Sequence, residues 1–192
     1  MSDFITFDTN EIVFGKPSNP VHTFKCSGFG LGELIKDMHN PVGLEIGCDV
    51  GDTALFLLES NPTLYLYSID PYENYVDWNG RPLNEREEVY QTMMKRIKAH
   101  ELRFELLRKT SDEAVPFFNN MKFDFIFIDG LHTYEQLSKD CVNYYPLLKD
   151  GGIFSGHDFT AIEGVNRAAK EFAATVNKEI LTTECDVWYW YK

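Results

Sequence analysis

Short apolar runs and amphipathic segments alternate along most of the chain. Continuous apolar runs such as Phe125–Ile128 are typical of strands buried on both faces, and segments between the runs have helical periodicity. Strands are predicted at Val42–Ile46, Leu64–Ile69, Arg103–Leu107, Asp124–Ile128 and Gly152–Ser155, and helices at Thr53–Ser60, Glu85–His100, Ser111–Phe118, Thr133–Tyr145 and Glu163–Thr175. Strands that alternate with helices predict parallel βαβ units, and therefore an α/β fold with helices on both faces of a sheet.

The two ends of the chain depart from this pattern. Residues 1–40 are irregular apart from one expected helix at Gly32–Met38. We expect them to form an extension that packs on a core domain of residues 41–192. At the other end, Glu179–Thr182 and Val187–Tyr191 are joined by a short turn and predict an antiparallel hairpin.

An aromatic segment, PYENYVDWNGRPLN, follows the second predicted strand. It is rich in turn-forming residues and carries Tyr72, Tyr75 and Trp78. We expect these rings to form a lid or substrate wall beside a site at the strand end, or else to pack on the adjacent helix.

Composition narrows the class of protein. A chain of 192 residues that is 44% apolar is most simply one folded domain. No apolar run reaches the roughly 20 residues of a membrane span, and no secretory signal is expected, because the first residues lack its basic and apolar regions. The four cysteines have no paired spacing, which indicates free thiols in the reducing cytoplasm. A net charge of −12 argues against a nucleic-acid partner.

The first predicted strand leads into a glycine-containing turn, GLEIGCDVGDT. Gly47 and Gly51 let the backbone turn tightly and approach a bound group closely. Asp70 ends the next strand, 19 residues after Gly51, where a carboxylate can accept hydrogen bonds from both hydroxyls of a ribose. The same residues also fit a tight strand-to-helix turn that holds no ligand.

Three acids around this turn indicate the charge of the ligand. Asp49 stands where a dinucleotide motif has its middle glycine, and Asp52 begins the helix. Negative side chains there oppose a pyrophosphate. Together with Glu45 at the end of the strand, they favour a cationic or zwitterionic ligand and disfavour a nicotinamide dehydrogenase.

Two further strand ends carry acids and imidazoles. Asp129 and His132 follow the fourth strand, and His157 and Asp158 follow the fifth. We expect these strands to be neighbours, so that the four side chains lie together at one edge of the sheet. Two carboxylates and two imidazoles are what a divalent metal with an adjacent base needs. The alternative is that these residues only cap helices.

The stretch EIGCDVG resembles the first motif of class I S-adenosylmethionine-dependent methyltransferases, an acid, one residue, Gly, three residues and Gly. The resemblance extends from Val42 to Lys192 and implies a Rossmann-like, doubly wound, mostly parallel seven-stranded sheet in three α/β/α layers. It implies that Gly47 and Gly51 flank the methionine part of the cofactor and that Asp70 binds the ribose. Ser111 and Asp112 would border the adenine, although they also suit a helix N-cap. The implied cofactor-binding residues are Glu45, Gly47, Gly51, Asp70, Ser111, Asp112 and Asp129.

A second stretch narrows the resemblance to one branch. IDGLHTYEQ, a helix and then LLKDGGIFSGHD resemble the branch of catechol and metal-dependent macrolide-sugar O-methyltransferases. The resemblance implies a divalent ion held by Asp129, His157 and Asp158, with His132 as the catalytic base. His157 departs from the branch, where an acid is usual. Because imidazole favours zinc, iron or manganese over magnesium, the identity of the ion stays open.

The sequence therefore predicts a cytoplasmic methyltransferase that uses S-adenosylmethionine and a divalent ion to methylate an oxygen of a small hydroxylated acceptor, a sugar or a diol. A metal-independent enzyme with His132 acting alone and a non-catalytic S-adenosylmethionine-binding module are the alternatives. Asp70-Pro71-Tyr72 resembles an element of nucleic-acid amino-group methyltransferases. That element belongs after the fourth strand, so methylation of a nucleic-acid base is disfavoured. A homo-oligomer is left open.

Overall fold

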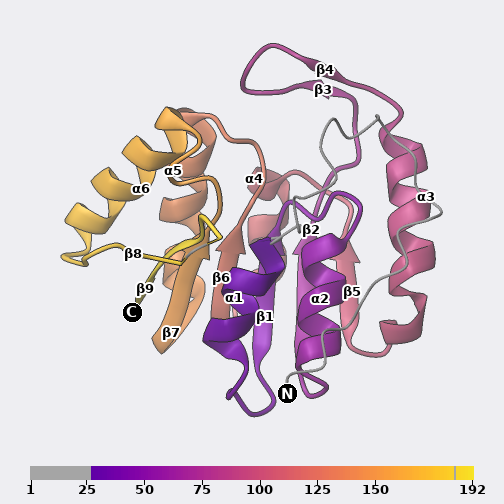
Figure 1. Cartoon of the computed structure of the whole chain (residues 1–192), viewed down its shortest axis with the longest axis horizontal. Coiled ribbons are helices and arrows are strands. Elements are labelled where there is room, and N and C mark those ends of the chain that lie inside the picture. Colours follow the sequence, from indigo (N-terminus) through magenta and orange to yellow (C-terminus); the bar gives the residue numbers. More distant parts are fainter. Residues whose placement is uncertain (1–26, 184) are drawn as a thin grey trace.

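The computed structural model describes residues 27–183 and 185–192, and a mostly parallel sheet forms the middle layer of this part (Figure 1). Its seven strands lie in the order β5-β2-β1-β6-β7-β9-β8. They are β1 (Val42–Ile46), β2 (Tyr65–Ile69), β5 (Phe104–Leu107), β6 (Phe123–Ile128), β7 (Leu148–Gly156), β8 (Leu181–Thr182) and β9 (Trp188–Tyr191). The first five strands in this order, from β5 across to β7, are parallel to one another. Strand β9 is antiparallel to its neighbours β7 and β8. The predicted fold class is confirmed.

The position of β6 in the middle of the sheet explains why its sequence is apolar without interruption. Phe125 and Phe127 pack against the helices of one face, whereas Ile126 and Ile128 pack against those of the other. All four side chains are buried. Each contributes roughly 1.5–3 kcal/mol by leaving water, so the strand stabilises both halves of the core.

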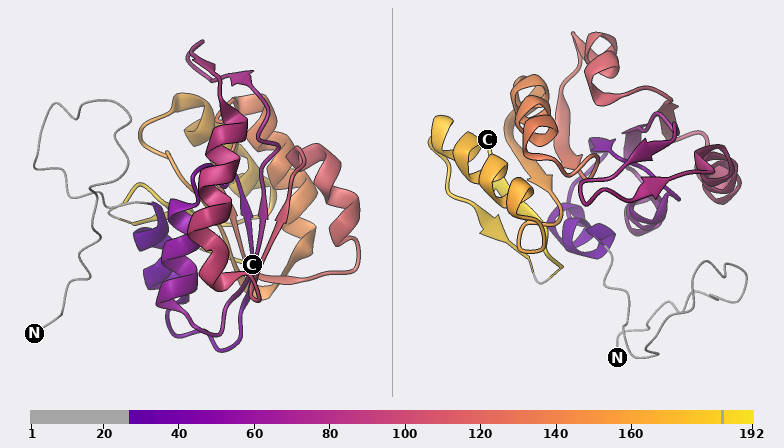
Figure 2. Two further views of the ribbon diagram at one scale, coloured as in Figure 1. Left: turned by 90° about the vertical axis from the view of Figure 1, so that its right-hand side faces the viewer. Right: turned by 90° about the horizontal axis from the view of Figure 1, so that it is seen from above.

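Helices cover both faces of the sheet (Figure 2). Helices α1 (Ser27–Ile35), α2 (Asp52–Ser60) and α3 (Arg86–Ile97) cover one face, and α4 (Ser111–Ala114), α5 (Tyr134–Tyr144) and α6 (Glu163–Thr175) the other. Short 3-10 helices follow α3, α4 and α5, at Lys98–His100, Val115–Phe118 and Tyr145–Leu147. They account for the last turns of three helices that the sequence predicts as single elements.

Two predicted boundaries are wrong. Helix α1 begins at Ser27 and not near Gly32. Its glycines let it pack closely, since a Cβ on Gly32 would lie 2.7 Å from the ring of Phe56. The strand predicted at Gly152–Ser155 begins four residues earlier, since β7 spans Leu148–Gly156. There the amide of Lys192 donates to the carbonyl of Gly152 over 2.9 Å, so pairing with the chain end extends the strand.

The aromatic segment contains a hairpin that the sequence did not predict. Strands β3 (Tyr75–Val76) and β4 (Pro82–Leu83) pair antiparallel and stand above the carboxyl ends of the main sheet (Figure 1). Asp77 stabilises the turn, because its carboxylate accepts the amides of Asn79 and Arg81 over 3.1 and 2.8 Å.

The three aromatic rings of this segment differ in burial. Tyr72 is only 2% exposed and packs in the core. Tyr75 and Trp78, on the hairpin, are 39% and 48% exposed. Only the hairpin rings are therefore free to face a bound molecule.

The N-terminal extension is described in part. Residues 1–26 lie outside the described residues. Helix α1, which follows them, packs against α2 through Phe29 and Phe56, whose ring centroids are 6.2 Å apart. The division at residue 40 stays a prediction. Among the helices of residues 27–183 and 185–192, none is long and apolar enough to cross a membrane.

Candidate active site

The site is built where the carboxyl ends of β1, β2, β6 and β7 meet. Gly47 follows β1 with a φ of +93°, and a Cβ there would lie 2.1 Å from the carbonyl oxygen of Asp129, so only glycine fits. The amide of Asp129 donates to the carbonyl of Ile46 over 2.8 Å, and the amide of His157 to that of Ile128 over 3.2 Å. These bonds continue the parallel pairing past the strands and align the ends of β1, β6 and β7. The strand order reverses direction between the neighbours β1 and β6. Ligands of open α/β sheets bind at the carboxyl ends of the strands at such a reversal.

Asp70 lies beside the glycine turn, at the end of β2, as the sequence predicts. It is 8% exposed, and one carboxylate oxygen accepts the amides of Cys48 and Asp49 over 3.2 and 2.9 Å. Its other oxygen accepts the amide of Tyr72 over 2.9 Å. An ionised carboxylate has about four acceptor positions, so Asp70 fixes the turn and keeps capacity for a ligand hydroxyl.

Glu45 has a different environment from the one its sequence position suggests. Its side chain is 0% exposed, and its Oε2 accepts the hydroxyl of Ser68 over 2.6 Å. Its Oε1 has no hydrogen-bond partner among the described residues. Burial, with the charge of Asp129, raises the pKa of Glu45 to about 8. The carboxyl group is therefore mainly protonated at neutral pH and does not supply the negative charge expected of it.

Asp49 and Asp52 each have an arginine partner on α3. Arg86 Nη1 donates to Asp49 Oδ1 over 2.6 Å, and Arg96 Nη2 donates to Asp52 Oδ1 over 2.5 Å. Asp49 still occupies the position of a glycine in a dinucleotide motif, so binding of a pyrophosphate there stays unfavourable. However, the two acids are paired, so they do not leave the turn negatively charged, and the expectation of an acidic turn is corrected.

Ser111 and Asp112 lie at the start of α4, beside α5. The N-cap is Thr110, which exchanges hydrogen bonds with Glu113 in a capping box, so Ser111 and Asp112 are not caps. Gln136 of α5 donates to Ser111 Oγ over 3.0 Å. These polar groups are therefore free of the capping role and border the same edge of the sheet.

A buried acid supports this pair from below. Asp140 is 1% exposed and accepts a hydrogen bond from Gln136 over 3.1 Å. Burial raises its pKa to about 6. The sequence analysis missed Gln136 and Asp140, whose spacing of four residues on a polar helix face was the available signal.

The acids and imidazoles of β6 and β7 meet as predicted. His132 Nε2 lies 3.1 Å from Asp129 Oδ1 and 3.1 Å from Asp158 Oδ2. One ligand atom from each of these three residues lies within 4.8 Å of the others, a spacing that a metal ion could bridge. The group defined by distance thus contains His132, where the sequence placed His157.

His157 faces the same acids with a fixed orientation. Its Nδ1 lies 3.2 Å from Asp158 Oδ1 and 3.8 Å from Asp129 Oδ1. Its Nε2 donates to the carbonyl of Cys185 over 3.0 Å, which leaves Nδ1 toward the carboxylates. Metal-binding histidines are commonly held in this way by their second nitrogen.

The carboxylates set the charge of both rings. Burial alone would lower the pKa of His132, but the hydrogen bond and charge of Asp129, with the charge of Asp158, raise it above the usual value. Against the same effect of burial, Asp158 and Asp129 raise the pKa of His157 to about 9. The hydrogen bond from His157 in turn lowers the pKa of Asp158. The edge thus pairs acids with imidazolium groups that a cation could replace.

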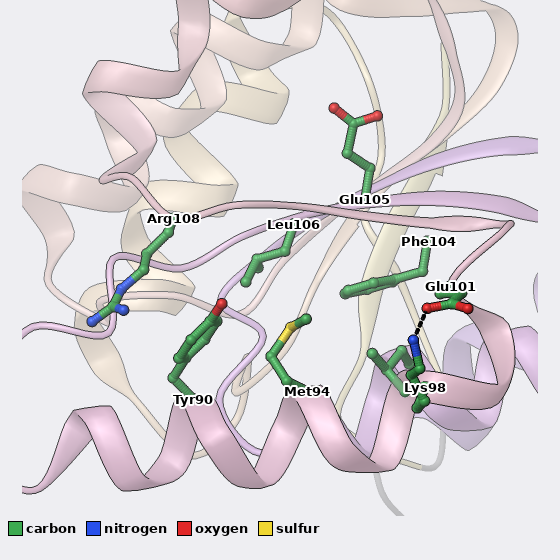
Figure 3. A pocket seen from close by; sticks show the side chains of 9 residues that line it. Tyr90, Met94, Lys98, Glu101, Phe104, Glu105, Leu106 and Arg108 are labelled. Atoms are coloured by element: carbon green, nitrogen blue, oxygen red, sulfur yellow. Dashed lines mark hydrogen bonds and ion pairs between the residues drawn. The ribbon is translucent and has the colours of Figure 1, made fainter.

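A separate hollow of about 310 Å³ lies away from this chemistry, between α3 and the edge strand β5 (Figure 3). Tyr90, Met94 and Leu106 line it, and an ion pair joins Lys98 to Glu101 at one end. Glu105 points to the other side of the strand. The hollow contains no acid–imidazole pair among its lining residues, so we do not assign it to the reaction.

Residues 44–159 match a family described as a methyltransferase domain. The matched part includes the glycine turn, Asp70 and both strand ends with their acids and imidazoles. The chain belongs to this methyltransferase family. No curated protein sequence matches it.

Solved structures share the fold of this methyltransferase. The O-methyltransferase NovP aligns with a TM-score of 0.66 and 15% identity over 86% of this chain and 77% of its own. A Staphylococcus aureus protein assigned as a caffeoyl-CoA O-methyltransferase has a TM-score of 0.60 and 18% identity, over 84% and 80%. The SAH-bound Podospora anserina methyltransferase PaMTH1 has a TM-score of 0.61 and 16% identity, over 84% and 76%. At these identities the likeness establishes the fold.

Proposed function

We propose that this methyltransferase transfers the methyl group of S-adenosylmethionine to an oxygen of a small hydroxylated acceptor, a sugar or a diol, with a divalent ion as second cofactor. The observation that carries the proposal is the convergence of two acids and two imidazoles beside the glycine turn: Asp129, His132, His157 and Asp158. NovP and the Staphylococcus aureus protein, both named as O-methyltransferases, share the fold and support oxygen as the methylated atom.

The cofactor would bind along the edge formed by β1, β2 and β5. Gly47 lets the turn pack directly on the backbone of Asp129, where a Cβ would clash, and this turn would flank the methionine part. Asp70 retains an acceptor position for a ribose hydroxyl. Ser111 and Asp112 are free of capping and would border the adenine. The polar groups of this edge therefore match the hydroxyl and adenine groups of the cofactor in hydrogen-bonding character.

Asp129, His157 and Asp158 would hold the ion. Two carboxylates and one imidazole are a common donor set for a divalent ion. We assign His157 rather than His132 as the third ligand because Nε2 of His157 is anchored on a backbone carbonyl and Nδ1 faces the acids. When bound, the ion would lower the pKa of an acceptor hydroxyl.

His132 would act as the base. Its Nε2 lies 3.1 Å from an oxygen of each carboxylate, within reach of a hydroxyl held between them. In the metal-bound site, His132 would lose its proton because the charge of the carboxylates is neutralised. It would then accept the acceptor's proton at Nε2, while the glycine turn and Asp70 hold the methyl donor in line.

The test is product formation in the presence and absence of the ion. EDTA-treated protein is incubated with S-adenosylmethionine and a panel of sugars and vicinal diols, catechol included, and S-adenosylhomocysteine is measured. We expect product when Mn²⁺ or Mg²⁺ is restored and little without it. Equal rates in EDTA would favour the metal-independent alternative. Binding of S-adenosylhomocysteine without turnover of any acceptor would favour the non-catalytic module.

A further inference from the structure

Arg86 carries no motif that marks it as a site residue, yet its side chain lies between the glycine turn and the end of β2. It is the first residue of α3 and is 7% exposed. Its Nη1 donates to Asp49 Oδ1 over 2.6 Å, and its Nη2 lies 3.8 Å from Asp70 Oδ2. One guanidinium group therefore joins the glycine turn to the end of β2.

The same guanidinium group also contacts the base of the hairpin. Its central carbon lies 5.7 Å from the ring centroid of Tyr72 and 5.8 Å from that of Tyr75. Tyr72 in turn donates its hydroxyl to the carbonyl of Asp49 over 2.7 Å. Arg86 thus fixes three segments that meet around Asp70.

This arrangement is costly for stability, which argues against a purely structural role. Arg86 Nε is buried and has no hydrogen-bond partner among the described residues, and a buried donor without a partner destabilises a fold. Tyr72 adopts a φ of +49°, an unfavourable value for a bulky side chain. Destabilising features of this kind cluster at functional sites. Here two of them lie beside Asp70, the residue predicted to bind the ribose.

A second arginine of α3 supplies the contrast. Arg96 also holds the glycine turn, since Nη1 donates to the carbonyl of Val50 over 2.7 Å and Nη2 to Asp52 over 2.5 Å. Its side chain is 27% exposed, and its ion-pair partner is Asp52, not Asp70. The two arginines thus share a helix and a turn but differ in contact with Asp70.

We propose that Arg86 is a positioning residue for the nucleoside half of S-adenosylmethionine, acting through Asp70. By neutralising Asp49 and holding the carboxylate of Asp70, it would keep the acceptor oxygen of Asp70 aimed at the ribose. The inference rests on the proposed use of S-adenosylmethionine at this edge.

Calorimetric titration of S-adenosylhomocysteine into the full chain tests the proposal. Arg86→Gln should bind about tenfold more weakly than the parent, the loss typical of one hydrogen bond to a charged group. Arg86→Lys should lie between the two, and the control Lys95→Gln, at an exposed position of the same helix, should bind like the parent. Titration of 5′-methylthioadenosine, which lacks the amino-acid half, should give the same ratio between parent and Arg86→Gln.

A double-mutant cycle separates positioning from general destabilisation. If Arg86 acts through Asp70, the Arg86→Gln/Asp70→Asn variant should bind no more weakly than Asp70→Asn alone, because coupled residues are not additive. Additive losses, or an Arg86→Gln protein that binds like the parent, would overturn the inference. Should Arg86→Gln fail to fold by circular dichroism, Arg86→Lys takes its place with the same criteria. A parent protein that binds no S-adenosylhomocysteine would instead contradict the proposed function.

Discussion

The acids in the two halves of the site have different kinds of partners. On the cofactor half, Asp70 is held by three backbone amides, and Asp49 and Asp52 by arginines. On the other half, Asp129 and Asp158 are paired with the imidazoles of His132 and His157. Arginine keeps its proton under all ordinary conditions, whereas imidazole can lose it near neutrality.

The difference indicates which half is built to exchange partners. Permanent pairs hold the cofactor half in one geometry. In the other half, neutral imidazoles would leave two carboxylates ready for a cation, and a released ring could serve as a base. The proposed function accordingly uses the first half for preorganised binding and the second for metal and proton chemistry.

The largest effect should come from removing a carboxylate of the second half. Asp129→Ala or Asp158→Ala should abolish retention of Mn²⁺, because the site then has too few protein ligands. Metal analysis after dialysis measures the result, and Asp150→Ala, an exposed acid elsewhere on β7, is the matched control. Ion retention by both site variants would show that the two acids do not form the metal site.

Replacing the proposed base should separate chemistry from binding. His132→Ala should lower turnover by roughly 10²–10⁴-fold, the range for a general base, while Mn²⁺ and S-adenosylhomocysteine still bind. In the parent, turnover should fall at acidic pH because His132 is protonated, and this limb should vanish in the variant. Loss of Mn²⁺ from His132→Ala, with retention in His157→Ala, would reverse the roles of the two rings.

Replacing Asp70 should affect the cofactor half and leave the metal half unchanged. Asp70→Ala removes hydrogen bonds to a charged group, worth roughly 1.5–3 kcal/mol each, so S-adenosylhomocysteine should bind at least about tenfold more weakly. Mn²⁺ retention should not change, since Asp70 lies on the other half. An Asp70→Ala protein that is folded and binds the cofactor like the parent would refute the ribose assignment.

The last prediction concerns Asp140, a buried acid that has no ion-pair partner among the described residues. In the folded state the pKa of Asp140 is about 6, above its usual value of 3.8, so the folded protein binds more protons than the unfolded one between these values. Its contribution to stability is therefore present at low pH and is lost as pH rises through about 6. Asp140→Asn should raise the free energy of unfolding at pH 7 by roughly 2 kcal/mol and leave it little changed at pH 4.

Urea unfolding at the two pH values measures the Asp140 effect, with the exposed Asp150→Asn as control. An equal change at pH 4 and pH 7 would mean that burial does not raise the pKa of Asp140.

Much of the fold could be predicted because it depends on local apolar pattern. The run Phe125–Ile128 specifies a strand covered on both faces, and the alternation of such runs with helices specifies the sheet. The β3–β4 hairpin escaped prediction because each strand has only two residues, too few for an alternating pattern. Helix α1 was misplaced because its glycines suggest a loop, whereas they permit close packing on Phe56.

The site divides in the same way. Strand-end acids and imidazoles were found because parallel strands bring their carboxyl ends together. Arg86 and Arg96 were missed because their partners lie 37 and 44 residues earlier in the chain, and only the packing of α3 beside the glycine turn brings them near. The protonated state of Glu45 was also missed, since it follows from complete burial and not from sequence position.

The central claim is that both halves act on one reaction, with the ion beside the methyl group that is transferred. The direct measurement is the NMR line width of S-adenosylmethionine, labelled with ¹³C in its methyl group, bound to the protein with Mn²⁺ or Mg²⁺. The account predicts that paramagnetic Mn²⁺ broadens the bound methyl signal strongly, that Mg²⁺ does not, and that Asp158→Ala abolishes the broadening while the cofactor stays bound. A methyl signal that is equally sharp with both ions, in protein that binds both ligands, would contradict it.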